Sequence, residues 1–350
     1  MSASASQGNA HPLTYRAAGV DIDAADELIR RIGRLARTTH GGQVVAGIGG
    51  FASLVALPGG QGPLLVTSCD GVGTKLKVAF ATGRHDTVGI DLVAMNVNDL
   101  LCCGATPLCF LDYLAMGRLD VEVGEALIRG ITEGCRQGGC ALVGGETAEL
   151  PGLYAPGEYD LAGFVVGTVT REALIDGHSV RAGDAVIGLP STGLHSNGYS
   201  LARRALVDDQ TDWQALVPEL GRSLADELMT PTRIYVEALR QLRAAVELRA
   251  VAHITGGGLI DNPPRVIPAT LAWRLELARW TVPPVMRLIA ERGRVAPEEM
   301  WRTFNMGLGM LVVVPADQAD AAVAAGAAVG ARVVGAIIER GERAVELIAP

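Results

Sequence analysis

The segment from Thr87 to Pro107, TVGIDLVAMNVNDLLCCGATP, constrains the fold more than any other part of the chain. Its apolar residues recur at the spacing of an α-helix and predict one buried helical face. The same helix carries Asp91 and Asp99. An ionised carboxylate beside a packed interior is costly unless a cation or a donor-rich ligand meets it. Either Asp alone could cap a helix or face solvent, but the two together favour a ligand-binding helix at the centre of the fold.

The composition fits a globular enzyme with an aliphatic core. Of the 350 residues, 49% are hydrophobic and only 4% are aromatic, and the 44 glycines indicate many tight turns. This length suits two ordinary domains or one large one. The six cysteines lie before residue 141 without a C-x-x-C pair, so we expect reduced thiols and no zinc site.

Charge and hydropathy argue against two classes of partner. The formal net charge is −8 and no run of Lys and Arg is present, so we expect no nucleic-acid partner. No apolar run approaches the roughly 18 residues of a membrane span. The N-terminal residues lack the apolar segment of a signal peptide, and we expect a cytoplasmic protein.

Helical and strand patterns are mixed in both halves, which predicts an α+β fold with two domains. The patterns predict helices over 23–32, 121–137, 199–207, 232–246 and 316–329, and strands over 63–68, 108–115, 160–169, 185–189 and 308–314. A polar, turn-rich stretch near 171–184 is the expected junction. We therefore expect a loose segment over 1–14, a first domain over 15–175 and a second over 182–350.

Three acidic residues lie in or beside glycine-rich segments. Asp70 follows a predicted strand in DGVGTK, Asp99 lies on the central helix, and Glu146 lies in GGETAE. Hard oxygen ligands of this kind suit Mg²⁺, which is usually shared with nucleotide phosphates. Lys75 could place a charge on a phosphate, or it could be a solvated lysine at a helix start.

Two further loops could bind an anion or move a proton. Gly256–Gly258 precede a predicted helix, where N–H groups converge. His195 lies in the polar loop PSTGLHSNG and could transfer protons near neutral pH, although an idle surface loop is an alternative. His253 lies among apolar residues, and we interpret it as a structural histidine.

Several blocks together resemble the phosphoribosylformylglycinamidine cyclo-ligases, the aminoimidazole ribonucleotide synthetases of purine biosynthesis. These blocks are YRAAGVDIDA, GIGGF, TSCDGVGTKLKVA, HDTVGIDLVAMNVNDLLCCGATPL, GCALVGGETAELPGLY, LPSTGLHSNGYSL, MTPTRIYV, AHITGGGLIDNPPRVIP and FNMGLGM. Blocks such as DGVGTK are shared with a wider superfamily that includes formylglycinamidine ribonucleotide synthetase, selenophosphate synthetase, thiamine-monophosphate kinase and a hydrogenase maturation protein. The alternatives are thus another ATP-using enzyme of this superfamily, or a non-catalytic nucleotide-binding maturation protein.

The resemblance implies ATP-dependent cyclisation of formylglycinamidine ribonucleotide to aminoimidazole ribonucleotide, with ADP and phosphate released. It implies ATP and Mg²⁺ as cofactors and leaves open a monovalent cation such as K⁺. It also implies a homodimer in which the mixed sheets of two first domains form a barrel, with a C-terminal α+β sandwich.

Site residues are carried over by position from the family. The resemblance assigns catalytic roles to Asp99, Lys75 and His195, and metal ligation to Asp70, Asp99 and Glu146. ATP binding is assigned to Gly49, Gly50, Phe51, Asp70, Gly71, Gly73, Thr74, Asp91, Gly104, Ala105, Pro107, Gly144 and Gly145. Binding of substrate or its phosphate is assigned to Ser196, Asn197, Thr255, Gly256, Gly257 and Gly258.

The chain departs from the family pattern at Gly33, Ala52 and Asn96, where lysine, glycine and cysteine are common. DNPPR also replaces ENIPR. None of these changes involves the three acids, so we expect an active enzyme, with nucleotide affinity as the property most open to change.

Overall fold

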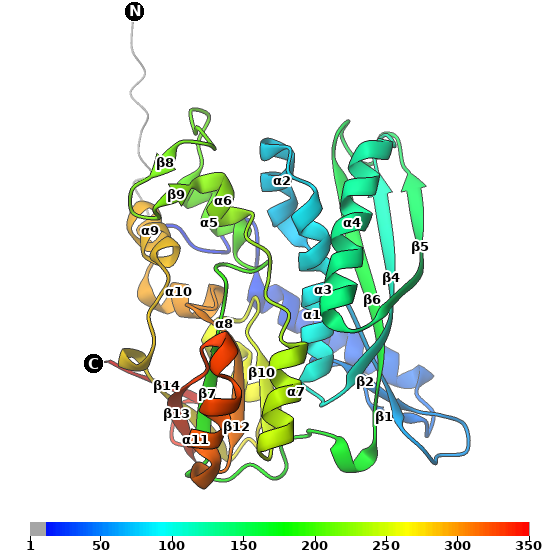
Figure 1. Cartoon of the computed structure of the whole chain (residues 1–350), viewed down its shortest axis with the longest axis vertical. Coiled ribbons are helices and arrows are strands. Elements are labelled where there is room, and N and C mark those ends of the chain that lie inside the picture. Colours follow the sequence, from blue (N-terminus) through cyan, green and yellow to red (C-terminus); the bar gives the residue numbers. More distant parts are fainter. Residues whose placement is uncertain (1–11, 350) are drawn as a thin grey trace, which may run out of the picture.

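The computed structural model describes residues 12–349, which form two six-stranded sheets and a two-stranded ribbon. The two sheets lie in successive halves of the chain, with β6 ending at Val169 and β7 beginning at Ala185. Figure 1 shows the halves side by side, with α3 and α7 along their junction. The α+β fold is confirmed.

The first half contains a mixed sheet in the order β1-β2-β3-β6-β4-β5. The β4–β5 pair is parallel and the other pairs are antiparallel. Its elements are α1 (Ile22–Ala36), β1 (Val44–Ala46), β2 (Ser53–Ala56), β3 (Leu64–Gly71), η2 (Gly73–Lys75), α2 (Leu76–Thr82), α3 (Asp86–Leu101), β4 (Thr106–Met116), α4 (Val121–Gly138), β5 (Ala141–Glu149) and β6 (Tyr159–Val169).

The central helix α3 packs against β3 and β6 on one face of this sheet and against α4 beside it. Glycines allow the two helices to cross closely: a Cβ on Gly130 would lie 1.8 Å from the Asp86 carbonyl oxygen. Most α3 residues are therefore buried, including Asp91 and Asn98. The opposite face of the sheet is uncovered, and Leu111, Tyr113 and Phe164 are exposed there.

The second half contains a sheet in the order β10-β12-β7-β13-β11-β14, in which only the β11–β14 pair is parallel. Helices α7 and α11 pack on one face of it. Its elements are β7 (Ala185–Pro190), α5 (Tyr199–Leu206), β8 (Leu216–Val217), β9 (Arg222–Ser223), α6 (Leu224–Leu228), α7 (Val236–Ala245), β10 (Ala250–His253), α8 (Gly258–Asp261), η4 (Pro263–Val266), β11 (Leu271–Glu276), η5 (Leu277–Arg279), α9 (Pro284–Gly293), α10 (Pro297–Thr303), β12 (Leu308–Val314), α11 (Ala319–Ala325), β13 (Arg332–Glu339) and β14 (Val345–Ile348).

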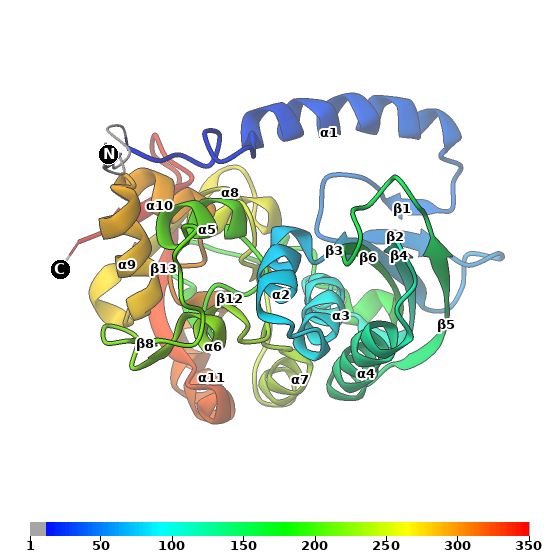
Figure 2. The same cartoon turned by 90° about the horizontal axis from the view of Figure 1, so that it is seen from above.

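Helix α1 lies across both halves on one side of the molecule (Figure 2). It begins at Ile22, one residue before the predicted start, and Asp21 Oδ1 caps it by accepting from the Ala24 amide at 3.0 Å. None of its residues is buried, and Leu28, Ile29, Ile32 and Leu35 are exposed.

Three predictions about local structure need correction. Most of the predicted loose segment 1–14 lies outside the described residues, but Leu13 is buried, and its amide donates to the Gly293 carbonyl at 3.1 Å. The helix predicted over 232–246 begins only at Val236, and the amides of Thr232 and Tyr235 donate instead to the side chains of Asp91 and Asn98 on α3. β11, α9 and α10 were not predicted.

No helix within residues 12–349 is both long and apolar enough to cross a bilayer.

Candidate functional site

Two carboxylates, Asp70 and Asp99, lie near each other at the junction of the halves. Asp70 is near the end of β3, and the Asn96 side chain on α3 donates to its backbone carbonyl at 3.3 Å. Asp99 lies one helical turn after Asn96. Its Oδ1 is 2.8 Å from His253 Nδ1 at the end of β10, and its Oδ2 accepts from Ser68 Oγ at 3.5 Å. Both sheets therefore position Asp99, whose side chain remains 14% exposed.

The surroundings of Asp70 make its negative charge unfavourable. Burial and the nearby Asp99 carboxylate raise the pKa of Asp70 to about 6, although the Gly71 amide and His253 act in the opposite direction. The Gly71 N–H donates to Asp70 Oδ1 at 2.7 Å. A carboxylate with a raised pKa beside a second carboxylate gains most from a cation, which would relieve their repulsion.

A glycine-rich loop lies across a cavity from Asp99. Residues 47–53 line a cavity of about 460 Å³ together with Ser68, Asp99 and residues 164–166 of β6. Gly49 has φ +128°, which favours glycine, so the loop can pass close to a ligand. Phe51 lies in the same loop. The Arg265 guanidinium is 5.7 Å from the centroid of the Phe51 ring, and this contact links the loop to the second half.

Two loops of the second half converge above α3. A Cβ on Gly256 would lie 3.5 Å from Asn197 Oδ1, and Asn197 Nδ2 is 3.8 Å from Met95 Sδ of α3. The Thr255 amide donates to Asn262 Oδ1, and the Gly258 amide donates to the Thr255 carbonyl. Among residues 12–349, the amides of Gly256 and Gly257 donate to no protein acceptor. Two adjacent unpaired N–H groups next to Asn197 form a site suited to phosphate.

His195 is placed behind this loop instead of facing the cleft. Its ring is buried, Nε2 accepts from the Thr192 amide at 3.2 Å, and Nδ1 has no partner within the described residues. Burial lowers the pKa of His195 well below its ordinary value, and His253, Lys75 and Arg233 lower it further. The imidazole is therefore neutral at pH 7 and supports the loop geometry, which differs from the expected direct role in proton transfer.

Lys75 and Asp91, both of the first half, form a buried ion pair at the junction with the second half. Lys75 Nζ lies 2.6 Å from Asp91 Oδ2, and both side chains are 0% exposed. Asp91 Oδ1 accepts from the Thr232 amide at 2.7 Å and from its hydroxyl at 2.6 Å, and Lys75 donates to the Thr230 carbonyl at 2.8 Å. In this arrangement the two charges balance each other inside the protein. The geometry gives both residues a structural role, in contrast to the predicted phosphate and ATP contacts.

Glu146, Gly144 and Gly145 are far from the acidic pair within one chain. Across the sheet, Glu146 of β5 lies beside Tyr113 of β4, and Tyr113 lies beside Ala162 of β6. Ala162 in turn lies beside Gly71, the last residue of β3. Three strand spacings separate Glu146 from the end of β3, a distance of about 14 Å. Among residues 12–349, no three His, Cys, Asp or Glu side chains cluster as a metal site. Of the three predicted metal ligands, only Asp70 and Asp99 lie near each other within a single chain.

The remaining predicted nucleotide residues fall into two groups. Gly104, Ala105 and Pro107 line a separate cavity of about 150 Å³ between the end of α3 and α7. Gly71 ends β3, and Gly73 and Thr74 form the turn after it, where Thr74 Oγ1 lies 3.0 Å from Ser200 Oγ. Ser196 Oγ contacts Thr232 Oγ1 at 3.0 Å.

Sequence reasoning missed His253, Ser68 and Arg265. His253 was interpreted as structural, and its complete burial agrees with this, but its contact with Asp99 places it in the site. Its position at the end of a strand just before Thr255–Gly258 was the available signal. No sequence pattern indicated that Arg265 would contact Phe51 across the two halves.

The residues present fit a magnesium-bound nucleotide phosphate. Mg²⁺ is usually held by one or two carboxylates, with phosphate oxygens and water completing its shell. Asp99 lines the glycine-loop cavity and Asp70 supplies a second carboxylate near it, and the free amides of Gly256 and Gly257 supply an anion site. A third protein carboxylate is not required.

Two family matches cover most of the chain. Residues 49–169 match the N-terminal domain of AIR synthase related proteins, and residues 181–348 match the C-terminal domain of the same proteins. A phosphoribosylformylglycinamidine cyclo-ligase of Sorangium cellulosum is 56% identical over 94% of this chain and 97% of its own length. The protein of the same name from Myxococcus xanthus is 57% identical over 86% of this chain and 88% of its own length.

Solved structures share the fold at low identity. The hydrogenase maturation protein HypE in complex with ATP has a TM-score of 0.61 and 20% identity, with 83% of this chain and 82% of that chain covered. Thiamine-monophosphate kinase from Stenotrophomonas maltophilia has a TM-score of 0.59 and 21% identity, with 92% of this chain and 94% of that chain covered.

Proposed function

The chain belongs to the phosphoribosylformylglycinamidine cyclo-ligases, and we propose from this membership how its residues divide the work of the reaction. The enzyme converts formylglycinamidine ribonucleotide into aminoimidazole ribonucleotide, and ATP becomes ADP and phosphate. The observation that carries this function is the 56% identity to a cyclo-ligase over 94% of the chain. Because the reaction consumes ATP, we place it in the cytoplasm.

The chemistry proceeds by activation and ring closure. The formyl amide oxygen attacks the γ-phosphorus of ATP, and ADP leaves. The amidine nitrogen then attacks the activated carbon, and the C–O bond breaks as phosphate leaves and a proton is lost. Phosphoryl transfer requires mainly positioning and charge neutralisation from the protein.

We assign the metal and phosphate contacts to the first half. Asp70 and Asp99 would hold Mg²⁺, which neutralises charge on the transferring phosphoryl group when bound. The loop over residues 47–53 would enclose the nucleotide, since it lines the same cavity as Asp99. His253 and Ser68 would hold the Asp99 carboxylate in place through their hydrogen bonds.

We assign the ribonucleotide phosphate to the second half. The unpaired amides of Gly256 and Gly257 point to an anion, and Asn197 lies beside them. His195 and the Lys75–Asp91 pair would keep the loops in register from behind, because all three side chains are buried. The amidine substrate would then lie between this phosphate site and the acids.

A second copy of the chain could complete the site. The uncovered face of the first sheet carries Leu111, Tyr113 and Phe164 in the open, which supports pairing of two such faces. Pairing would bury these side chains and bring the exposed Glu146 of one chain toward another chain. We propose a homodimer formed through this face.

The decisive experiment measures ADP and phosphate release with and without formylglycinamidine ribonucleotide. We expect release only when this substrate is present, with one ADP formed for each ring closed. Steady ATP turnover without the substrate would favour another enzyme of the superfamily. No turnover with it would favour a non-catalytic nucleotide-binding protein, and either result would overturn the assignment.

A further inference from the structure

The largest cavity described in the chain is separate from the site above. Its volume is about 890 Å³, and α1, α8, η4, η5, α10 and β14 form its walls. It is lined by neither of the acids Asp70 and Asp99, and by none of the loop residues 47–53, 195–197 or 255–258. Its size is in the range of cavities that hold small organic ligands.

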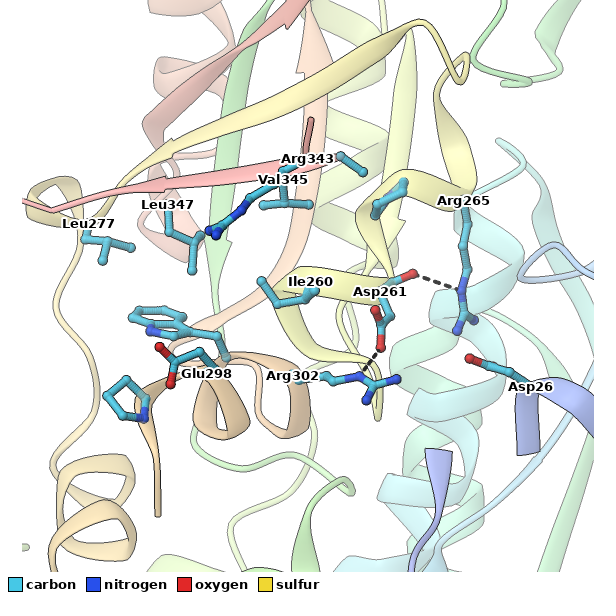
Figure 3. Close-up of a pocket in the computed structure, with 14 residues that line it drawn as sticks. Asp26, Ile260, Asp261, Arg265, Leu277, Glu298, Arg302, Arg343, Val345 and Leu347 are labelled. Atoms are coloured by element: carbon cyan, nitrogen blue, oxygen red, sulfur yellow. Dashed lines mark hydrogen bonds and ion pairs between the residues drawn. The ribbon is translucent and has the colours of Figure 1, made fainter. Parts of the chain in front are cut away.

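The floor of this cavity is apolar. Ile260 of α8, Leu277 of η5 and Val345 and Leu347 of β14 line it, together with the indole of Trp301. Figure 3 shows Val345 and Leu347 on one side and Glu298 on the other side of the cavity. A flat ring could therefore be covered on both faces by apolar groups.

Three of the six charged residues that line this cavity, Asp261, Arg265 and Arg302, have partners. Arg302 lies 2.8 Å from Asp261 and 2.6 Å from Asp23, and Arg265 donates to the Asp261 carbonyl at 3.2 Å (Figure 3). Among residues 12–349, Glu298 and Arg343 have neither an ion-pair nor a hydrogen-bond partner. Asp26 also has none, and it lies beside Arg265 at the far end of the cavity (Figure 3).

Glu298 and Arg343, two of these three unpaired residues, require different ligand groups. Glu298 can only accept hydrogen bonds when ionised, and it precedes Trp301 by three positions on α10, so both lie on one helix face. A ring stacked on the indole would present its edge to this carboxylate, which requires an N–H donor there. Arg343 offers a planar set of donors that suits a phosphate.

We propose that this cavity binds an adenine mononucleotide, with the ring on Trp301, the exocyclic amine at Glu298 and the phosphate at Arg343. The proposal does not depend on the catalytic assignment, because it uses different residues. Asp261, next to Ile260 in the wall, lies three residues after Gly258, so an occupied cavity would also contact the helix that follows the anion loop.

The test compares AMP with purine riboside 5′-monophosphate, which lacks the exocyclic amine and has no N–H donor on the same ring edge. Isothermal titration calorimetry on the full chain should show AMP binding at least about tenfold more tightly than this analogue, because Glu298 would lose its N–H partner. Glu298→Gln supplies an amide donor and should reduce or reverse this preference. Arg343→Gln should weaken both nucleotides at least about tenfold.

Arg129→Gln on α4 is the matched control, because Arg129 is exposed and lines a different surface. It should leave AMP binding unchanged, and all three variants should keep the Michaelis constant for ATP. Absence of AMP binding, equal affinity for AMP and purine riboside 5′-monophosphate, or AMP affinity within twofold of wild type in both cavity variants would overturn the proposal. Binding that survives both variants and is displaced by ATP would place AMP in the catalytic cleft instead.

Discussion

Asp91 and Asp99 lie on one helix, yet their surroundings assign them opposite functions. Asp91 is fully buried and its charge is balanced by Lys75 and Thr232. Asp99 is partly exposed, beside a cavity, and its contacts are His253 and Ser68. Substitution of each by asparagine should therefore separate stability from catalysis.

Asp99→Asn should abolish turnover without unfolding the protein. The amide is nearly isosteric, but it loses the charge needed to hold a metal-bound phosphate. We expect kcat to fall by about 10²-fold or more, since metal charge stabilisation contributes several kcal/mol. The thermal midpoint should stay within a few degrees of wild type. Near-normal rates would show that Asp99 is structural and that the metal assignment is wrong.

Asp91→Asn should instead destabilise the fold, because it leaves the Lys75 ammonium buried without a counter-charge. Loss of one partner of a buried pair costs about 3–5 kcal/mol. Urea unfolding should report this loss. The double variant Lys75→Met/Asp91→Asn removes the unpaired charge and should recover part of it. If the single variant were as stable as wild type, the pair would not hold the two halves together.

The raised pKa of Asp70 predicts a pH dependence in the free enzyme. Below about pH 6 the carboxyl is protonated and cannot bind a cation, so the Michaelis constant for Mg²⁺ should rise as pH falls from 7 to 5. The contribution of Asp70 to folding stability changes with pH in the opposite direction. It is fully present below pH 3.8, the ordinary pKa of an aspartate, and is lost as pH rises through about 6.

Kinetics at several magnesium concentrations, together with unfolding of the metal-free protein, would test both trends. Asp70→Asn should remove the unfolding trend between pH 4 and about 6. A Michaelis constant for Mg²⁺ that is flat from pH 7 to 5 in the wild type would contradict the assignment of Asp70 as a ligand.

At the level of elements, the close crossing of α3 and α4 keeps the central helix against its sheet. Gly130→Ala would place a Cβ 1.8 Å from the Asp86 carbonyl oxygen, so the backbones must separate. We expect a loss of about 1–3 kcal/mol in unfolding free energy. The control is Gly124→Ala on the same helix, where nothing lies within 4 Å of the added methyl group.

Gly124→Ala should be neutral or stabilising by about 0.5–1 kcal/mol, because alanine is the better helix former. Denaturant unfolding of the two variants side by side is the measurement. Equal effects at the two positions would mean that helix propensity, and not the crossing distance, sets the stability of this helix pair.

For the whole molecule, the uncovered face of the first sheet predicts the oligomeric state. Leu111 and Phe164 are directly opposite on β4 and β6, and they are 37% and 42% exposed in one chain. If the proposed homodimer forms through this face, the double variant Leu111→Glu/Phe164→Glu should sediment as a monomer where the wild type sediments as a dimer, because charges would be buried in an apolar interface. Analytical ultracentrifugation measures the change.

Leu216→Glu is the matched control, since Leu216 is also exposed but belongs to the ribbon β8 of the second half. It should leave the sedimentation of the dimer unchanged. A double variant that still sediments as a dimer would show that another surface joins the chains.

The sequence by itself determined the strands and helices with strong periodicity, such as β6 and α4, because side-chain burial repeats along one element. It also determined that the acids of α3 need partners, since buried charge is costly wherever it lies. Its family blocks led to the reaction. These are local properties, or they depend on residue order alone.

Only the tertiary structure decided which partner each acid has. Lys75 looked available for a phosphate in sequence, but folding placed its ammonium on Asp91, while His253 reached Asp99 from 154 positions away. Sheet order separated Glu146 from Asp70, although both lie next to glycines in the sequence. The physical reason is that charges are neutralised by whatever packing brings within a few ångströms, and sequence spacing does not encode that distance.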